Sequence, residues 1–63
     1  MYSAEQMQLF IGRLGTQQDA DDMQYLLKNL GWELVLEEDK RVHAYRDGKD
    51  RIDEARKEAI LAL

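Results

Sequence analysis

The first quarter of the chain repeats its apolar positions with the period of an α-helix. Four apolar residues recur at i, i+3, i+4 and i+7, the spacing of one helical face: Met7, Phe10, Ile11 and Leu14. Ser3 followed by Gln6 has the spacing of a capping box, which favours a helix start. Gly15 follows the last apolar position, and glycine adopts the left-handed conformation that ends many helices. The pattern predicts a helix that begins after Ser3 and ends at Gly15.

A second amphipathic helix is predicted directly after the first. Its apolar face has the same period: Met23, Leu26, Leu27 and Leu30. Thr16 can cap the start of this helix, and Gly31 follows the last periodic residue, as a glycine beyond a helix end does. Two such helices joined by a short Gly-Thr connection form an antiparallel hairpin, in which each covers the apolar face of the other.

From Trp32 onward the apolar period changes from helical to two. The apolar residues Trp32, Leu34 and Leu36 alternate with Glu33, Val35 and Glu37, which is typical of a half-buried strand. A second short run, at about residues 41–46, is its predicted partner. The two runs lie close enough in sequence to pair as an antiparallel β-hairpin.

The register of this hairpin depends on the length of its turn. A three-residue loop of residues 38–40 pairs Leu36 with Val42 in the core and leaves His43 and Tyr45 on the outer face. A two-residue loop of residues 39–40 pairs Leu36 with His43 instead, and turns His43 and Tyr45 inward. The first register is favoured because Val42 matches Leu36 better than His43 does. Neither loop contains the glycine or asparagine that fixes a turn type.

A third helix is predicted to complete the chain. Asp47-Gly48 is the strongest turn signal, and Asp50 can cap the helix that follows. The inner face of this helix consists of Ile52, Ala55, Arg56, Ala59, Ile60 and Leu63. The sequence therefore predicts one compact α+β domain over residues 1–63. Its order is α-α-β-β-α, with a helical hairpin packed on a two-stranded antiparallel β-hairpin and a C-terminal helix.

Length and composition limit what this domain can contain. With 63 residues, it buries only about 60% of the surface that its unfolded chain exposes. It has no cysteine and a single histidine, so we expect no disulfide, no metal site and no cofactor. Small domains commonly need an additional stabilising contact, which here would come from a homodimer or another partner. The start lacks a basic region and the longest uncharged stretch, residues 6–12, is too short for a bilayer, so we expect a cytoplasmic protein.

The residues needed for catalysis are scarce. The two aliphatic hydroxyls, Ser3 and Thr16, are predicted helix caps, and there is only one imidazole. No glycine-rich phosphate loop is present, and adjacent carboxylates point in different directions on a helix or strand. We therefore expect a protein that is not an enzyme.

Nucleic-acid binding is the weaker of two remaining functions. Five cations gather at and after the β-hairpin: Lys40, Arg41, Arg46, Lys49 and Arg51. An exposed basic ribbon can contact phosphates. The net charge of −4, however, opposes general polyanion affinity. A helix-turn-helix reading of the first two helices also fails, because the first turns of its recognition helix would carry Asp19, Asp21 and Asp22, which repel phosphates.

Protein binding fits the chain better. The open edges of a small sheet can accept a strand from a partner, and some apolar surface stays on its outer face. The candidate partner-binding residues are acidic or apolar: Asp19, Asp21, Asp22, Val35, Glu37, Glu38, Asp39 and Tyr45. Small acidic domains without catalytic groups are typical of phage and mobile-element inhibitors. We therefore expect a stoichiometric regulator or inhibitor that binds a protein partner through an acidic and apolar surface.

Overall fold

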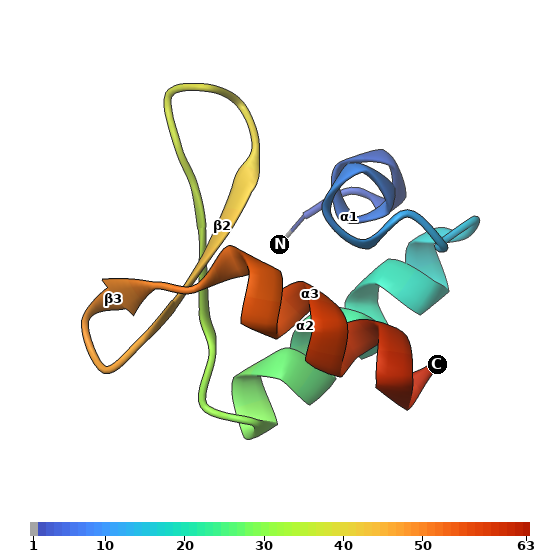
Figure 1. Cartoon of the computed structure of the whole chain (residues 1–63). Coiled ribbons are helices and arrows are strands. Elements are labelled where there is room, and N and C mark those ends of the chain that lie inside the picture. Colours follow the sequence, from blue (N-terminus) through green and yellow to red (C-terminus); the bar gives the residue numbers. More distant parts are fainter. Residues whose placement is uncertain (1) are drawn as a thin grey trace.

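The computed structural model describes residues 2–63 and confirms the α+β class. The elements in this range are α1 (Ala4–Ile11), α2 (Gln17–Asn29), β1 (Glu33–Leu36), β2 (Val42–Arg46), β3 (Lys49–Asp50) and α3 (Ile52–Ala62). The helices pack together on one side of the antiparallel sheet, and the β1–β2 hairpin extends beyond them (Figure 1). The order α-α-β-β-α is as predicted, with β3 as an additional strand. No helix in this part of the chain is long and apolar enough to cross a membrane.

Helix α1 begins as predicted and ends earlier than predicted. The Ser3 hydroxyl accepts from the Gln6 amide, and the Gln6 side chain accepts from the Ser3 amide, which completes the capping box. The helix ends at Gly12 (φ 80°), so the predicted stop at Gly15 is wrong. Gly12 precedes Gly15 in the chain, and as a glycine it adopts the left-handed conformation of the helix end at little energetic cost. Leu14 is still buried, but it belongs to the connection after the helix.

Helix α2 has the predicted ends. The Thr16 hydroxyl accepts from the Asp19 amide, and Gly31 (φ 91°) follows the last turn. Met23 and Leu27 are buried and Leu26 is half-buried, as the apolar period predicts. Leu30 is 41% exposed, so its predicted place in the core is wrong. It is the C-cap residue, where the chain already turns away from the helix axis.

The sheet has the favoured hairpin register and one strand more than predicted. Leu34 lies opposite Ala44, and Leu36 lies opposite Val42. Asp47 (φ 55°) and Gly48 (φ 75°) then form the two-residue turn that pairs Arg46 with Lys49. Two positive φ values are the mark of a type I′ turn, which joins adjacent strands tightly. The sheet order is β1-β2-β3, so β2 is central and the edges belong to β1 and β3.

Helix α3 lacks the predicted aspartate cap. Its N-cap is Arg51, for which no side-chain capping bond is found among residues 2–63. Asp50 belongs to β3 and uses its carboxylate elsewhere, so its predicted capping role is wrong. Ala55 and Ala59 are fully buried, which allows α3 to approach the core closely. Leu63 is 54% exposed, so its predicted place on the inner face is wrong, because the helix ends at Ala62.

The core is closed by a contact between Trp32 and Arg46. Among residues 2–63, twelve buried apolar residues from the helices, their connections and the inner face of the sheet form one cluster. The Trp32 indole N–H donates to Glu58 at 3.1 Å, and the Arg46 guanidinium lies 3.9 Å from the centre of the Trp32 ring. Arg46 also donates to the Leu30 carbonyl at 2.7 Å and pairs with Glu58 at 3.1 Å. This arginine therefore joins β2 to the end of α2 and to α3.

The segment before α1 is attached to α2 and to the sheet by side-chain amides. Gln24 accepts from the Tyr2 amide at 3.1 Å and donates to the Tyr2 carbonyl at 3.0 Å. Gln17 also donates to that carbonyl, at 3.1 Å. The Tyr2 hydroxyl donates to the Leu34 carbonyl at 2.6 Å. These bonds hold an aromatic ring beside β1.

Candidate functional site

The outer edge of β1 carries backbone groups that β2 does not use. In an antiparallel pair, successive residues point their backbone groups alternately toward the partner strand and away from it. The Glu37 amide donates to the Arg41 carbonyl, which places the bonded pairs at Val35 with His43 and at Glu33 with Tyr45. The amides and carbonyls of Leu34 and Leu36 therefore point to the free edge. The bond from Tyr2 to the Leu34 carbonyl agrees with this assignment.

A hollow of about 520 Å³ lies beside this edge, between α2 and β1. Three aromatic residues line it: Tyr2, Tyr25 and Trp32. Its charged residues are two acids and one base: Asp21, Glu33 and Lys28. Burial raises the pKa of Tyr2, and the charge of Glu33 raises it further, which favours the protonated hydroxyl that donates to the Leu34 carbonyl. The hollow is therefore aromatic, with an excess of negative charge.

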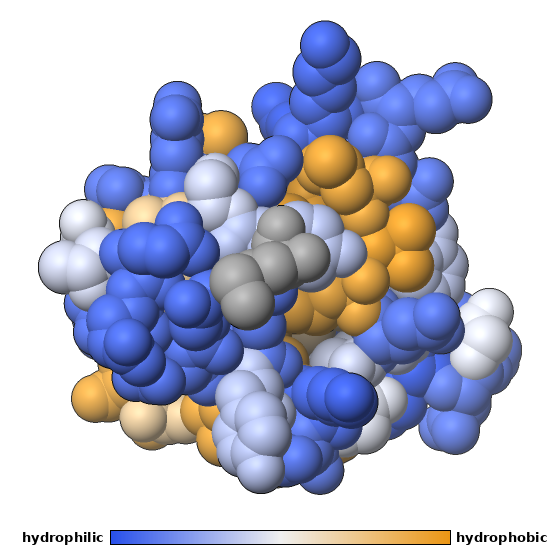
Figure 2. All heavy atoms as spheres, turned by 180° about the vertical axis from the view of Figure 1, so that it is seen from behind, coloured by the Kyte–Doolittle hydropathy of each residue, from blue (hydrophilic) through white to orange (hydrophobic). Residues whose placement is uncertain are grey.

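Exposed apolar side chains adjoin the edge and the hollow. Leu36 is 46% exposed although it lies on the inner face of the sheet, and Tyr25 on α2 is 70% exposed. Figure 2 shows an apolar area on the face seen from behind, where the hairpin lies, with hydrophilic side chains around it. An apolar centre with a charged rim is the common layout of protein interfaces.

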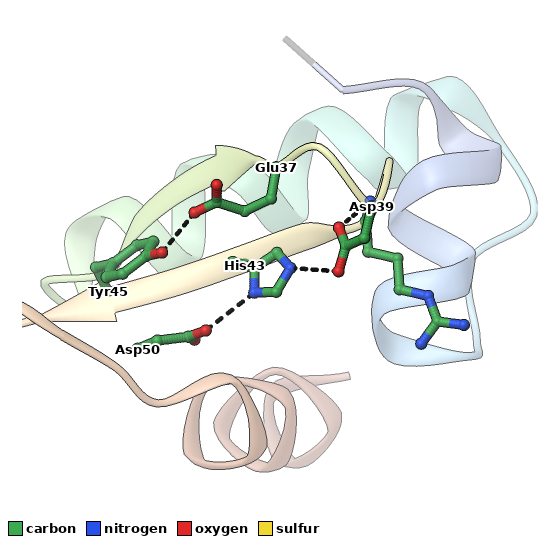
Figure 3. Close-up of polar contacts among 6 residues, drawn as sticks. Glu37, Asp39, His43, Tyr45 and Asp50 are labelled. Atoms are coloured by element: carbon green, nitrogen blue, oxygen red, sulfur yellow. Dashed lines mark hydrogen bonds and ion pairs between the residues drawn. The ribbon is translucent and has the colours of Figure 1, made fainter.

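The outer face of the sheet holds His43 between two carboxylates. Its Nε2 lies 2.9 Å from Asp39 and its Nδ1 lies 2.9 Å from Asp50, so a loop and β3 both meet the ring (Figure 3). The hydrogen bonds to Asp50 and then Asp39 raise the pKa of His43. A backbone bond from Arg41, followed by the bond to His43, lowers the pKa of Asp39. This arrangement stabilises the imidazolium ion and joins the hairpin tip to β3.

The same face carries a tyrosine–carboxylate pair. The Tyr45 hydroxyl donates to Glu37 at 2.5 Å (Figure 3). That hydrogen bond is the main reason why the pKa of Tyr45 is raised from 10.0 to about 12. Both His43 nitrogens and the Tyr45 hydroxyl are thus engaged by carboxylates of the hairpin tip and of β3. Within residues 2–63, no group of three or more acidic or histidine side chains is placed to hold a metal ion.

The predicted acidic residues lie in two separate places. Asp19, Asp21 and Asp22 belong to the first turns of α2, whereas Glu37, Glu38 and Asp39 lie at the hairpin tip. Figure 1 shows α1 between the beginning of α2 and the tip. Of these six residues, only Asp21 lines the hollow beside β1. The acidic side of the hollow is completed by Glu33, which is not among the predicted partner-binding residues.

Other predicted partner-binding residues lie on the outer face of the sheet. Val35 and Tyr45 are half-buried there, as the favoured register requires. Glu37 and Asp39 are engaged with Tyr45 and His43, and Glu38 is exposed. The outer side of β1 thus presents Glu33 and Val35, and Glu37 follows on the same side directly after the strand.

The predicted basic residues are also divided. Arg46 is held against Trp32 and Glu58, and Arg51 lies 3.6 Å from Glu54. Lys40, Arg41 and Lys49 are exposed. Lys40 and Arg41 line a second hollow of about 490 Å³ between the hairpin tip and the helices α1 and α3, and Lys49 lies in β3. The five cations therefore do not form one uninterrupted ribbon.

Sequence reasoning missed the aromatic hollow. Tyr2 and Tyr25 do not fit the apolar period of a helix face, and a strand partner for Tyr2 cannot be read from local spacing. One signal was present: all five glutamines fall in the first 24 residues, and Gln17 and Gln24 hold the Tyr2 backbone.

Comparison of the chain with protein-family models, with curated proteins and with solved structures finds no match.

Proposed function

We propose that this chain is a non-enzymatic protein that binds another protein stoichiometrically, as a regulator or an inhibitor. The observation that carries the proposal is the acidic, aromatic hollow beside the free edge of β1. Binding at this place needs no catalytic group, because a ligand that occupies its target's surface acts by occupancy alone.

Burial and charge around the hollow support this proposal. Tyr25 and Leu36 expose large apolar side chains near the hollow and the edge, and aromatic residues are enriched in interface centres. Asp21 and Glu33 supply negative charge at the rim. Opposite charge on a partner increases the association rate and selects against wrong partners. The target is therefore expected to present a basic, partly apolar surface.

Nucleic-acid binding has less support. Two of its five candidate cations, Arg46 and Arg51, lie against carboxylates of α3. Arg46 would also have to leave the Trp32 ring to reach a phosphate. Three exposed cations, Lys40, Arg41 and Lys49, remain for such a role, on a chain whose net charge is −4.

Affinity capture with point variants tests the proposal. The tagged protein is incubated with a lysate of cells that naturally express it, and the retained proteins are quantified against the bait. We expect one protein in stoichiometric amount, and we expect its loss with Tyr25→Ser and with Asp21→Lys. Leu61→Ser is the matched control, because Leu61 is 77% exposed on α3 and does not line the hollow.

Two results contradict the proposal. One is that no protein is retained in stoichiometric amount, or that the hollow variants retain it as well as the control does. The other is that the chain binds nucleic acid in a salt-sensitive manner and that reversing Lys40, Arg41 and Lys49 abolishes the binding. The second result establishes the nucleic-acid alternative instead.

A further inference from the structure

We propose that the partner adds an extended, basic segment as a fourth strand, antiparallel to β1, with cationic side chains opposite Glu33 and Glu37. This inference rests on the proposed function and specifies the chemistry and the geometry of the partner. It is carried by three features of the described residues: the backbone groups of β1 that point away from β2, the charges on its outer side and the apolar groups on its inner side.

The edge of β1 presents backbone groups that a fourth strand can bond. The amides and carbonyls of Leu34 and Leu36 point away from β2, as the register and the bond from Glu37 to Arg41 require. An added antiparallel strand forms two bonds with each of these residues. The Tyr2 hydroxyl occupies one acceptor position of the Leu34 carbonyl. A carbonyl oxygen has two lone pairs, so this bond does not prevent a second one.

The outer side of β1 selects for positive charge. Glu33 and Val35 lie on this side of β1, and Glu37, whose carboxylate accepts a hydrogen bond from Tyr45, directly follows the strand on the same side. A carboxylate thus stands at each end and an apolar residue in the middle. Side chains directly opposite each other on neighbouring strands attract when their charges are opposite and repel when they are alike. The best-matched segment therefore has two lysines or arginines with three residues between them, one opposite Glu33 and the other opposite Glu37.

The inner side of β1 selects for apolar side chains. Leu34 is half-buried and Leu36 is 46% exposed, so residues opposite them can bury additional apolar surface. The hollow with Tyr25 and Trp32 adjoins Leu34 on the same side. The preferred segment accordingly has a cation, an apolar residue, a neutral residue, a second apolar residue and a second cation, in that order.

A second copy of this chain fits the edge less well. Self-pairing over the whole strand has its two-fold axis at Val35 and places Glu33 of one copy opposite Glu37 of the other. Like charges directly opposite each other destabilise a strand pair. The same two glutamates that attract a basic segment thus disfavour a homodimer through β1.

A synthetic peptide tests the inference on the intact protein. The probe has the core Lys-Leu-Thr-Leu-Lys between Gly-Ser flanks, and binding is followed by nuclear magnetic resonance titration of the backbone amides. We expect the largest shifts at Leu34 and Leu36. A peptide with both lysines replaced by glutamate should bind at least about tenfold more weakly, because two cross-strand attractions become repulsions.

Methylation of single peptide amides tests the geometry. Antiparallel pairing directs the amides of the two peptide leucines toward β1 and the amide of the threonine away from it. N-methylation of either leucine should abolish binding, whereas N-methylation of the threonine should leave it nearly unchanged. Equal effects of the two changes, or equal binding of the acidic peptide, would overturn the inference.

Charge reversal in the protein completes the test. Glu33→Lys should weaken the lysine peptide about tenfold and strengthen the glutamate peptide, whereas Glu5→Lys, the same change on the exposed side of α1, should do neither. Self-association of the unaltered protein through this edge, detected by sedimentation, would also overturn the inference. If the edge experiments fail while a captured protein is still lost with Tyr25→Ser, the inference fails and the proposed function stands. If no stoichiometric protein is captured at all, the proposed function itself fails.

Discussion

Replacing Arg46 by methionine removes three interactions and keeps most of the apolar stem. The guanidinium lies 3.9 Å from the centre of the Trp32 ring, donates to the Leu30 carbonyl at 2.7 Å and pairs with Glu58 at 3.1 Å. A cation over a largely buried ring contributes about 1–2 kcal/mol. A hydrogen bond from a charged donor contributes about 1.5–3 kcal/mol, and a half-exposed ion pair contributes at most about 1 kcal/mol.

The net loss is smaller than the sum of these contributions. Glu58 and the Leu30 carbonyl are partly exposed, so water replaces part of the lost hydrogen bonding in the methionine variant. We therefore expect Arg46→Met to lower the free energy of unfolding by about 2 kcal/mol. For a domain of this size, that corresponds to a decrease of about 10 °C in Tm. Chemical and thermal denaturation followed by circular dichroism measure both quantities.

Lys49→Met is the matched control for this prediction. Lys49 lies opposite Arg46 in the β2–β3 pair but is exposed, so its replacement should change stability by less than about 0.5 kcal/mol. A double-mutant cycle with Glu58→Gln should also show a coupling of at least about 0.5 kcal/mol with Arg46. Equal, small effects of Arg46→Met and Lys49→Met on the free energy of unfolding would refute the reasoning. Arg46 would then be as available to contact nucleic acid as the exposed cations are.

Three further predictions concern the core and the outer face. Leu27→Ala should cost about 2–5 kcal/mol in denaturation experiments because Leu27 is fully buried, whereas Leu61→Ala should cost less than about 0.5 kcal/mol; similar costs would contradict the assigned core. The bonds to Asp50 and Asp39 raise the pKa of His43 in the folded state, so protonated His43 stabilises the fold. The difference in unfolding free energy between the protein and His43→Gln should be complete below pH 6.5 and should disappear as the pH rises through the folded-state pKa. A pH-independent difference would refute these two bonds. Ultraviolet absorbance should show Tyr45 ionising near pH 12, and Glu37→Gln should return its pKa toward 10.0; an unchanged titration curve would contradict the Tyr45–Glu37 bond.

The local pattern of the sequence predicts most of the fold, because the decisive signals are local. The capping box at Ser3, the Thr16 cap and the Asp47-Gly48 turn each involve residues within a few positions of one another. The hairpin register also follows from a short-range choice, since pairing Leu36 with Val42 buries apolar surface.

The failures of sequence reasoning concern residues with a choice of partners. Asp50 has the spacing of a helix cap, but it lies in β3 opposite Tyr45, and its carboxylate bonds to His43 of β2. Arg46 looks like one member of a basic cluster, yet its partners Trp32 and Glu58 come from distant parts of the chain. Tyr2 reaches Leu34 over 32 positions. Such tertiary contacts leave no periodic trace in the sequence.

Hydrogen exchange at the edge of β1 tests the central claim most directly. Without peptide, the amides of Leu34 and Leu36 point to the free edge and should exchange quickly, whereas the Val35 amide is paired with His43 and should exchange slowly. Saturating amounts of the Lys-Leu-Thr-Leu-Lys peptide should slow exchange at Leu34 and Leu36 and leave Val35 nearly unchanged. Unchanged exchange at both leucines, or protection that appears only at Lys49 and Asp50 on the opposite edge, would contradict the claim that β1 accepts a basic strand.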